Sequence, residues 1–313
     1  MTAPAAASSE EHARLTSRAA TFSVAVALIL IALKAWAWIS SSSVAMLASL
    51  ADSTLDLAAS LFTYFAVRYA ATPPDREHRF GHGKAESFAA LIQGGLVAVS
   101  GALVALEAGR RFVDPQPITH GIESIAVMVL SMALTGALVF AQTKAIDRTG
   151  SVATKGDRLH YAADLGANVV VIVGIVAGAF FSFTWADAAA GVIVAAWLVW
   201  GALHLAGQAA DNLLDRELPD EQRARIRALA EADPRLGRAH DLRTRTSGPY
   251  IHIQFHADLE PLLTLEEAHK IVVAAEERIR AEFPTADIII HPDPRGRAEA
   301  HGHEHFEPRQ DGA

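Results

Sequence analysis

The stretch Asp52-Ser-Thr-Leu-Asp56 lies within the otherwise apolar run from Val44 to Ala70, which is long enough to cross a bilayer. Its two acidic residues are four positions apart, so on a helix they share one face, a single turn apart. A carboxylate at membrane depth costs about 2.5–3.5 kcal/mol on insertion scales, so two within one span need compensation. A bound cation, a water-filled path or a proton would supply it, as would a neighbouring Arg or Lys if the pair is purely structural.

Apolar residues are unevenly distributed along the chain. The sequence has 313 residues, of which 51% are hydrophobic and 20% charged. The long apolar runs are confined to residues 21–206. We therefore expect a disordered N-terminal arm over residues 1–18, which lacks the apolar core of a signal peptide, and a transmembrane domain over residues 19–206. A cytoplasmic domain over residues 207–294 and a disordered tail over residues 295–313 would follow.

Six segments are each long enough to cross about 30 Å of hydrocarbon at about 1.5 Å per residue. They cover residues 19–40, 44–70, 85–107, 121–145, 159–183 and 185–206. An even number of spans places both termini on one side of the membrane. Basic residues gather on that side, at Arg14, Arg18, Arg68, Arg76, Arg79, Lys84, Lys144, Arg148, Lys155 and Arg158. The opposite loops offer Arg110 and Arg111, so the positive-inside rule predicts cytoplasmic termini. Within the first span, we expect Lys34 to snorkel outward.

The C-terminal part combines helical and strand periodicity. The pattern predicts helices over residues 219–233 and 265–283, and strands over 241–246, 250–259 and 286–291. In the second strand, Ile251, Ile253 and Phe255 face one side, whereas His252 and His256 face the other. This order predicts a small α/β sandwich with its helices on one face of the sheet.

Composition limits the chemistry that the chain can perform. There are no cysteines, which excludes disulfides and thiolate metal sites, so any metal must be held by Asp, Glu and the 14 His residues. The net charge of −8 offers no basic surface for nucleic acid.

A second pair of ligand-type residues, His160-Tyr-Ala-Ala-Asp164, lies near the start of the fifth span. Two helices that each offer an i, i+4 pair can close four ligands around one ion. One imidazole and three carboxylates suit tetrahedral Zn²⁺ and its neighbours. Because Asp52 lies well inside its span, the fifth helix should begin before Leu159 to bring the pairs to one depth.

These pairs belong to a larger set of motifs. The others are Phe80-Gly-His-Gly-Lys-Ala-Glu86, Leu213-Leu-Asp-Arg216, His240-Asp-Leu-Arg-Thr-Arg245 and Ile290-His-Pro-Asp-Pro294. From Ala19 to Pro294 the chain resembles the cation diffusion facilitators, above all their bacterial zinc and ferrous-iron efflux members. The resemblance implies a homodimer in the bacterial inner membrane, exporting divalent metal from the cytoplasm in exchange for protons. The implied fold is a six-helix transmembrane domain with a metallochaperone-like (ferredoxin-like) cytoplasmic domain.

The resemblance also assigns roles to residues. It implies a transport site of Asp52, Asp56, His160 and Asp164. Protons would compete with metal there, since a protonated His160 cannot be a ligand. It further implies a loop metal site, a cytoplasmic metal site and a charge interlock between the two domains. The loop site comprises Asp75, His78 and His82. The cytoplasmic site comprises His240, His256, His269, His291 and Asp293. The interlock pairs Lys84 with Asp215. Without a functional role, the loop residues would form a solvated loop, the histidines would be ordinary exposed side chains, and Lys84 and Asp215 would be unconnected surface charges.

Zn²⁺ is the expected substrate, with Cd²⁺ or Fe²⁺ as alternatives, because a His ligand disfavours Mn²⁺. An iron, cobalt or manganese exporter of the same fold stays open. A membrane-embedded metal-dependent hydrolase would need a general base, for which Glu86 is the nearby candidate. A metal sensor without transport would not need four ligands in the membrane. The tail histidines His301, His303 and His305 either gather metal or are simply solvated.

Overall fold

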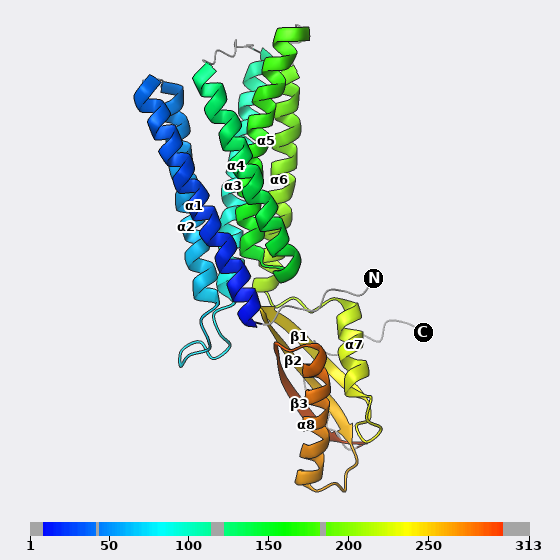
Figure 1. Ribbon diagram of the computed structural model, residues 1–313. Helices are drawn as coiled ribbons and strands as arrows, with labels where there is room; N and C mark the ends of the chain where they lie inside the picture. The colour runs from blue at the N-terminus through cyan, green and yellow to red at the C-terminus, as the bar shows by residue number, and fades with distance from the viewer. Residues whose placement is uncertain (1–8, 42–43, 114–121, 182–185, 297–313) are drawn as a thin grey trace. The chain divides into compact units, whose positions relative to one another are not determined.

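The computed structural model describes residues 9–41, 44–113, 122–181 and 186–296 (Figure 1). The chain divides into two compact units, Met1–Leu213 and Leu214–Ala313. The transmembrane domain was predicted to end at residue 206, but the last long helix continues to Leu213. The tail histidines lie outside the described residues.

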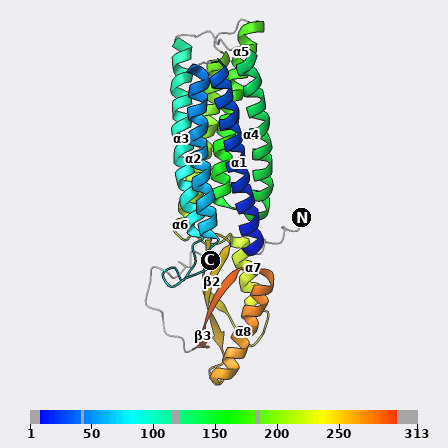
Figure 2. The same ribbon diagram turned by 60° about the vertical axis from the view of Figure 1, so that its left-hand side comes forward.

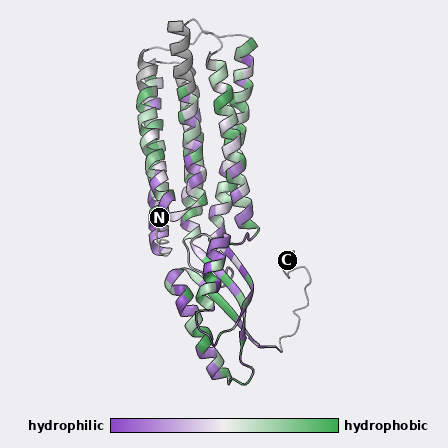
Figure 3. Ribbon diagram, turned by 90° about the vertical axis from the view of Figure 1, so that its right-hand side faces the viewer, coloured by the Kyte–Doolittle hydropathy of each residue, from purple (hydrophilic) through white to green (hydrophobic). Residues whose placement is uncertain are grey.

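The first unit consists of long helices that run side by side (Figures 1 and 2). They are α1 (Ser9–Ser41), α2 (Val44–Ala70), α3 (Lys84–Val113), α4 (Ile122–Thr149), α5 (Val152–Phe181) and α6 (Ala186–Leu213). Within the described residues, four stretches are long and apolar enough to cross a membrane: Ser9–Ser40, Lys84–Arg110, Val129–Thr149 and Ala188–Leu213. The remaining long helices, α2 and α5, carry the acidic residues of the two i, i+4 pairs. Apolar residues extend along much of the described helices (Figure 3).

Two helices begin earlier than the apolar runs do. Helix α1 begins at Ser9, so residues 9–18 of the arm predicted to be disordered are helical. His12 is buried there and its Nε2 lies 3.0 Å from Glu86 Oε1 of α3, which explains why this polar segment is ordered. Helix α5 begins at Val152, within the basic segment. This confirms the early start that the depth of Asp52 required.

The prediction that Lys34 snorkels outward is wrong. Its Nζ donates to the Ser49 carbonyl at 3.2 Å and to Ser53 Oγ at 2.6 Å, both on α2. The ammonium therefore finds hydrogen-bond acceptors on the neighbouring helix, and it ties α1 to α2.

Helices α1, α4 and α5 pack around a shared core, and α2 contacts α1, α3 and α5. Helices α3 and α6 pack together and against α5. The first core includes Val26, Leu30, Leu138 and Tyr161. Helix α5 approaches α3 closely, because Gly156 leaves no side chain between them: a Cβ there would lie 2.9 Å from the Cβ of Gln93. This arrangement gives α5 a central position, with neighbours on both sides.

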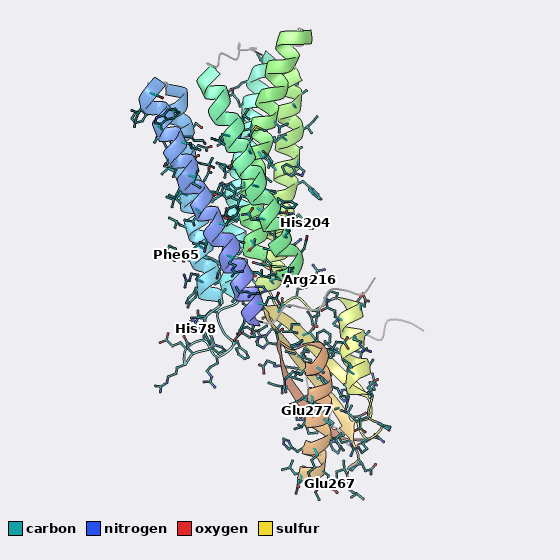
Figure 4. The ribbon with its side chains drawn as sticks, viewed as in Figure 1. Phe65, His78, His204, Arg216, Glu267 and Glu277 are labelled. Carbon is teal, nitrogen blue, oxygen red and sulfur yellow. The ribbon has the colours of Figure 1, made fainter. Side chains whose placement is uncertain are left out.

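The second unit contains α7 (Asp220–Ala230), β1 (Ala239–Ser247), β2 (Tyr250–Leu259), α8 (Leu265–Glu282) and β3 (Ala286–Pro294). The predicted order of helix, strand, strand, helix and strand is confirmed. The sheet order is β1-β2-β3, with β1 antiparallel and β3 parallel to β2. Helix α8 makes the crossover that parallel strands require. Its N-terminus has a capping box between Thr264 and Glu267. Glu267 is labelled in Figure 4.

The core of this unit lies between the sheet and the two helices. Ile253 and Phe255 of β2 are buried against Ile226 of α7 and Ile279 of α8. Strand β3 extends to Pro294, further than the predicted end at residue 291. It is an edge strand, where proline is tolerated because the outer side of the strand needs no donors.

Candidate metal centres

Three groups of His and Asp residues could hold a metal ion in the described part of the chain. In each group, every residue offers a ligand atom within 4.8 Å of the others. One group lies between α2 and α5, one on the loop between α2 and α3, and one on the sheet of the second unit.

The bundle site comprises Asp56 of α2 and His160 and Asp164 of α5. His160 Nε2 lies 2.9 Å from Asp56 Oδ1, and these two residues are 8% and 6% exposed. His160 and Asp164 share one helical face, so both face Asp56 across the α2–α5 contact. Two carboxylates and one imidazole within this distance match the donors that Zn²⁺ and its neighbours take.

Asp52 lies outside this group in the structure. It is on the same face of α2 as Asp56, but four residues place it about 6 Å further along the helix axis. Its side chain is exposed, and it interacts electrostatically with Asp56 and His160. The structure thus brings three of the predicted ligands together and leaves the fourth one turn away.

The loop group comprises Asp75, His78 and His82. His78 is labelled in Figure 4. Asp75 Oδ2 lies 3.3 Å from His82 Nε2, and Asp75 Oδ1 lies 3.5 Å from His78 Nδ1. The second ring nitrogen of His82 lies 3.3 Å from the Thr72 carbonyl, which orients the first toward Asp75. The backbone N–H groups of His78 and Glu77 donate to Asp75, and this lowers the pKa of its carboxyl. The carboxylate is therefore ionised and ready to bind a cation.

The third group comprises His256, His291 and Asp293 and lies on the sheet, at matching positions of its strands. The register pairs His240 with His256 and His256 with His291. Asp293 is 3% exposed and lies at the centre of the group: its Oδ2 is 2.9 Å from His256 Nδ1 and its Oδ1 is 3.3 Å from His291 Nε2. His240 Nε2 is 3.5 Å from Asp293 Oδ2. The sheet thus brings four of the five residues predicted for this site together.

The remaining predicted residues lie elsewhere. His269 is exposed on α8, outside the three groups found among the described residues. Lys84 donates to the Leu213 carbonyl at 3.2 Å, and Asp215 pairs with Arg245 at 3.3 Å, each within its own unit. The interlock between Lys84 and Asp215 stays a prediction.

Sequence reasoning did not identify Asp258, whose Oδ1 lies 3.5 Å from His240 Nε2. The register opposes Asp258 to Asp293 on the neighbouring strand. The alternation of β2 placed Asp258 on the same strand face as His252 and His256, which was the available signal.

Comparison with known proteins matches both units. Residues 20–214 match the model of the cation efflux transmembrane domain, and residues 218–295 match that of the cation efflux protein cytoplasmic domain. The cation-efflux pump FieF of Shewanella oneidensis is 42% identical over 281 residues, covering 90% of this chain and 94% of the relative. The FieF pump of Yersinia enterocolitica is 38% identical over 297 residues, covering 95% and 99%. A solved structure of CzrB in its Zn form covers 28% of this chain and 99% of its own, at 33% identity and a TM-score of 0.26.

Proposed function

The chain belongs to the cation efflux family, and from that premise we propose that it exports Zn²⁺ from the cytoplasm in exchange for protons. Membership confirms the predicted family, the helical transmembrane domain with its α/β cytoplasmic domain, and the dimeric fold class. It also confirms that the protein is a transporter of divalent metal and not an enzyme.

The observation that carries the proposal is the contact between Asp56 of α2 and His160 of α5, beside Asp164. When both are ionised, the two carboxylates of this group carry two negative charges, which balance the charge of one divalent ion. Neutral imidazole binds metal, whereas imidazolium repels it, so protons and metal compete for the same atoms. Asp52, one turn away, is the proposed fourth ligand, reached when the side chains close around the ion.

Orientation and location extend the proposal. The basic residues of the loops support cytoplasmic termini, and the bacterial relatives support an inner-membrane location. The substrate would then move from the cytoplasm outward while protons move inward. The His ligand favours Zn²⁺, Cd²⁺ or Fe²⁺ over Mn²⁺.

The decisive experiment measures metal flux into liposomes that hold the purified protein under an imposed pH gradient. The panel contains Zn²⁺, Cd²⁺, Fe²⁺, Co²⁺ and Mn²⁺. Zinc flux should depend on the gradient and should fall by about a hundredfold or more in Asp56→Ala and His160→Ala, since each loses a charged or coordinating ligand. His204→Ala, on the exposed surface of α6, is the matched control and should transport normally. Undiminished zinc flux in Asp56→Ala would refute the site, and a zinc flux that does not change with the imposed pH gradient would refute proton coupling.

The loop and sheet groups are proposed as further zinc sites on the cytoplasmic side. Their ligand sets, Asp75, His78 and His82, and His240, His256, His291 and Asp293, contain the His and Asp donors that zinc takes. Equilibrium zinc counting on the intact protein should show a smaller number of bound ions when the acidic member of each group, Asp75 or Asp293, is replaced by Asn. An unchanged count would assign that group a structural role.

A further inference from the structure

A buried carboxylate lies one helical turn from the bundle site, toward the end of the bundle where α2 ends and α5 begins. Asp157 precedes His160 by three residues on α5 and is 1% exposed. Its neighbour across the helix contact, Ser60, follows Asp56 by one turn on α2. A fully buried acid is rare in a membrane helix and is a functional candidate by default.

The hydrogen-bond partners that the structure gives this carboxylate are neutral groups from three other helices. Asp157 Oδ2 accepts from Ser23 Oγ of α1 at 2.5 Å and from Gln142 Nε2 of α4 at 2.8 Å. Asp157 Oδ1 lies 3.4 Å from Ser60 Oγ of α2. The Tyr161 hydroxyl holds Ser60 in place at 2.7 Å. The result is an oxygen-rich cluster in the core of α1, α2, α4 and α5, with a formal charge supplied by one carboxylate.

Gln142, which contacts Asp157 through its amide nitrogen, leaves a second polar atom of the cluster unpaired. This side chain is fully buried, yet its amide oxygen has no hydrogen-bond partner in the described residues. Leaving a buried acceptor unsatisfied costs about 1–3 kcal/mol. Rotating the amide by half a turn would direct this oxygen, instead of the nitrogen, toward Asp157. That orientation is unfavourable beside a bare carboxylate and favourable when a cation lies between the two.

We propose that Asp157, Ser23, Ser60 and Gln142 form a second cation position, which receives a divalent ion on its way between the loop-bearing end of the bundle and Asp56, His160 and Asp164. This inference rests on the proposed function. The oxygen atoms of the cluster are 2.5–3.4 Å from Asp157, similar to the spacing of ligands around an ion with metal–oxygen distances of about 2.0–2.6 Å. Small outward shifts of the four helices would therefore open a coordination site.

Its donor set makes this position weaker than the bundle site. One carboxylate with hydroxyl and amide oxygens supplies less charge than Asp56 and Asp164 together, and it lacks an imidazole. Weak binding is what a transit position needs, because an ion must enter easily and also leave. The two positions are one turn apart, so an ion can pass between them with a short movement along α5. Asp157 therefore affects the rate at which metal reaches the bundle site and does not affect how tightly the bundle site holds metal.

The test compares transport rates with equilibrium binding in the full chain, using Zn²⁺ as the probe. In Asp157→Asn, initial zinc flux at subsaturating metal should fall about tenfold or more, as expected for a lost charged ligand. Zinc bound at the bundle site, defined as the portion that Asp56→Ala removes, should keep its Kd within about threefold, since no ligand of that site has changed. Asp157→Glu keeps the charge and should recover most of the flux.

A second variant tests the cation position if Asp157→Asn does not fold. Gln142→Leu removes the proposed amide ligand and leaves the acid intact, and it should slow flux by about threefold to tenfold. Gln93→Leu is the matched control: Gln93 is also fully buried with an unpartnered amide oxygen, but its nitrogen donates to the Ala59 carbonyl and to Thr63. It should transport as the unchanged protein does.

Three outcomes would overturn the inference. Normal flux in Asp157→Asn would show that no ion uses this position. A parallel loss of flux and of zinc affinity at the bundle site would show that Asp157 shapes that site instead. If the unchanged protein moved no metal, the proposed function would fail and this inference with it.

Discussion

The buried ring of His252 shows how a single residue of the second unit responds to pH. It is 7% exposed, and its Nδ1 lies 3.3 Å from Asp287 Oδ2. Burial, together with the nearby Arg245, lowers the pKa of His252 below its ordinary value of 6.5. In the unfolded chain this histidine takes up a proton more readily than in the folded unit. Acidification through and below pH 6.5 therefore favours the unfolded state.

We predict that the metal-free unit, residues 214–313, loses stability between about pH 7.5 and 5.5, and that His252→Gln reduces this loss because its side chain cannot be protonated. Urea denaturation at both pH values, with chelator present, measures the change. His269→Gln replaces an exposed histidine of the same unit and should keep the original pH dependence. Equal pH dependence in all three proteins would contradict the prediction.

Much of the bundle site could be predicted at the scale of residues. The i, i+4 spacing of His160 and Asp164 placed both on one helical face, and the cost of an acid in a membrane span singled out Asp56. The same argument could not separate Asp52 from Asp56, because both share a face and their difference depends on how α2 sits against α5. Asp157 escaped notice because it lies in a polar segment whose burial follows from the early start of α5.

Helix packing at the element scale depends on the small residues of α5. Gly156 allows α5 to approach α3, because a Cβ there would meet Gln93 Cβ at 2.9 Å and Cγ at 3.3 Å. We predict that Gly156→Ala destabilises the bundle by about 1–3 kcal/mol, the usual cost of overpacking. Thermal unfolding of the detergent-solubilised protein measures the change.

The matched control for that substitution is Gly136→Ala on α4. An added Cβ at Gly136 meets nothing within 4 Å. Alanine is a better helix former than glycine by about 1 kcal/mol, so this variant should be neutral or slightly more stable. Two equally destabilised variants would show that the close α3–α5 approach is not the cause.

Elements of the second unit were easier to predict than those of the first. The alternation of β2 and the amphipathic pattern of α8 identified both directly, because each has one buried and one solvated face. In the bundle, a polar segment joined to an apolar span gives no such signal. Residues 9–18 were therefore missed, although His12 and Thr16 are buried within α1. The periodicity of the sequence also could not predict the register that brings His240, His256 and His291 together, because the register depends on how the strands pair.

At the scale of the whole molecule, each unit has a hydrophobic core of its own. We predict that Ile253→Ala, which empties a fully buried position of β2, destabilises the second unit by about 2–5 kcal/mol. Scanning calorimetry should show one transition moving to lower temperature while the transition of the helical unit stays in place. Ile289→Ala on β3, where the side chain is 56% exposed, should change little. A shift of both transitions in Ile253→Ala would mean that the units unfold together.

The two prolines of β3 limit the addition of a further strand to this edge of the sheet. The Arg295 N–H donates inward to the Leu259 carbonyl at 2.8 Å. Backbone groups alternate along a strand, so the positions that point outward are 292 and 294, and both are proline, which has no N–H to offer. An extended segment from another chain therefore finds no donors along this end of the edge. The unit is protected there against strand addition and fibre-like aggregation.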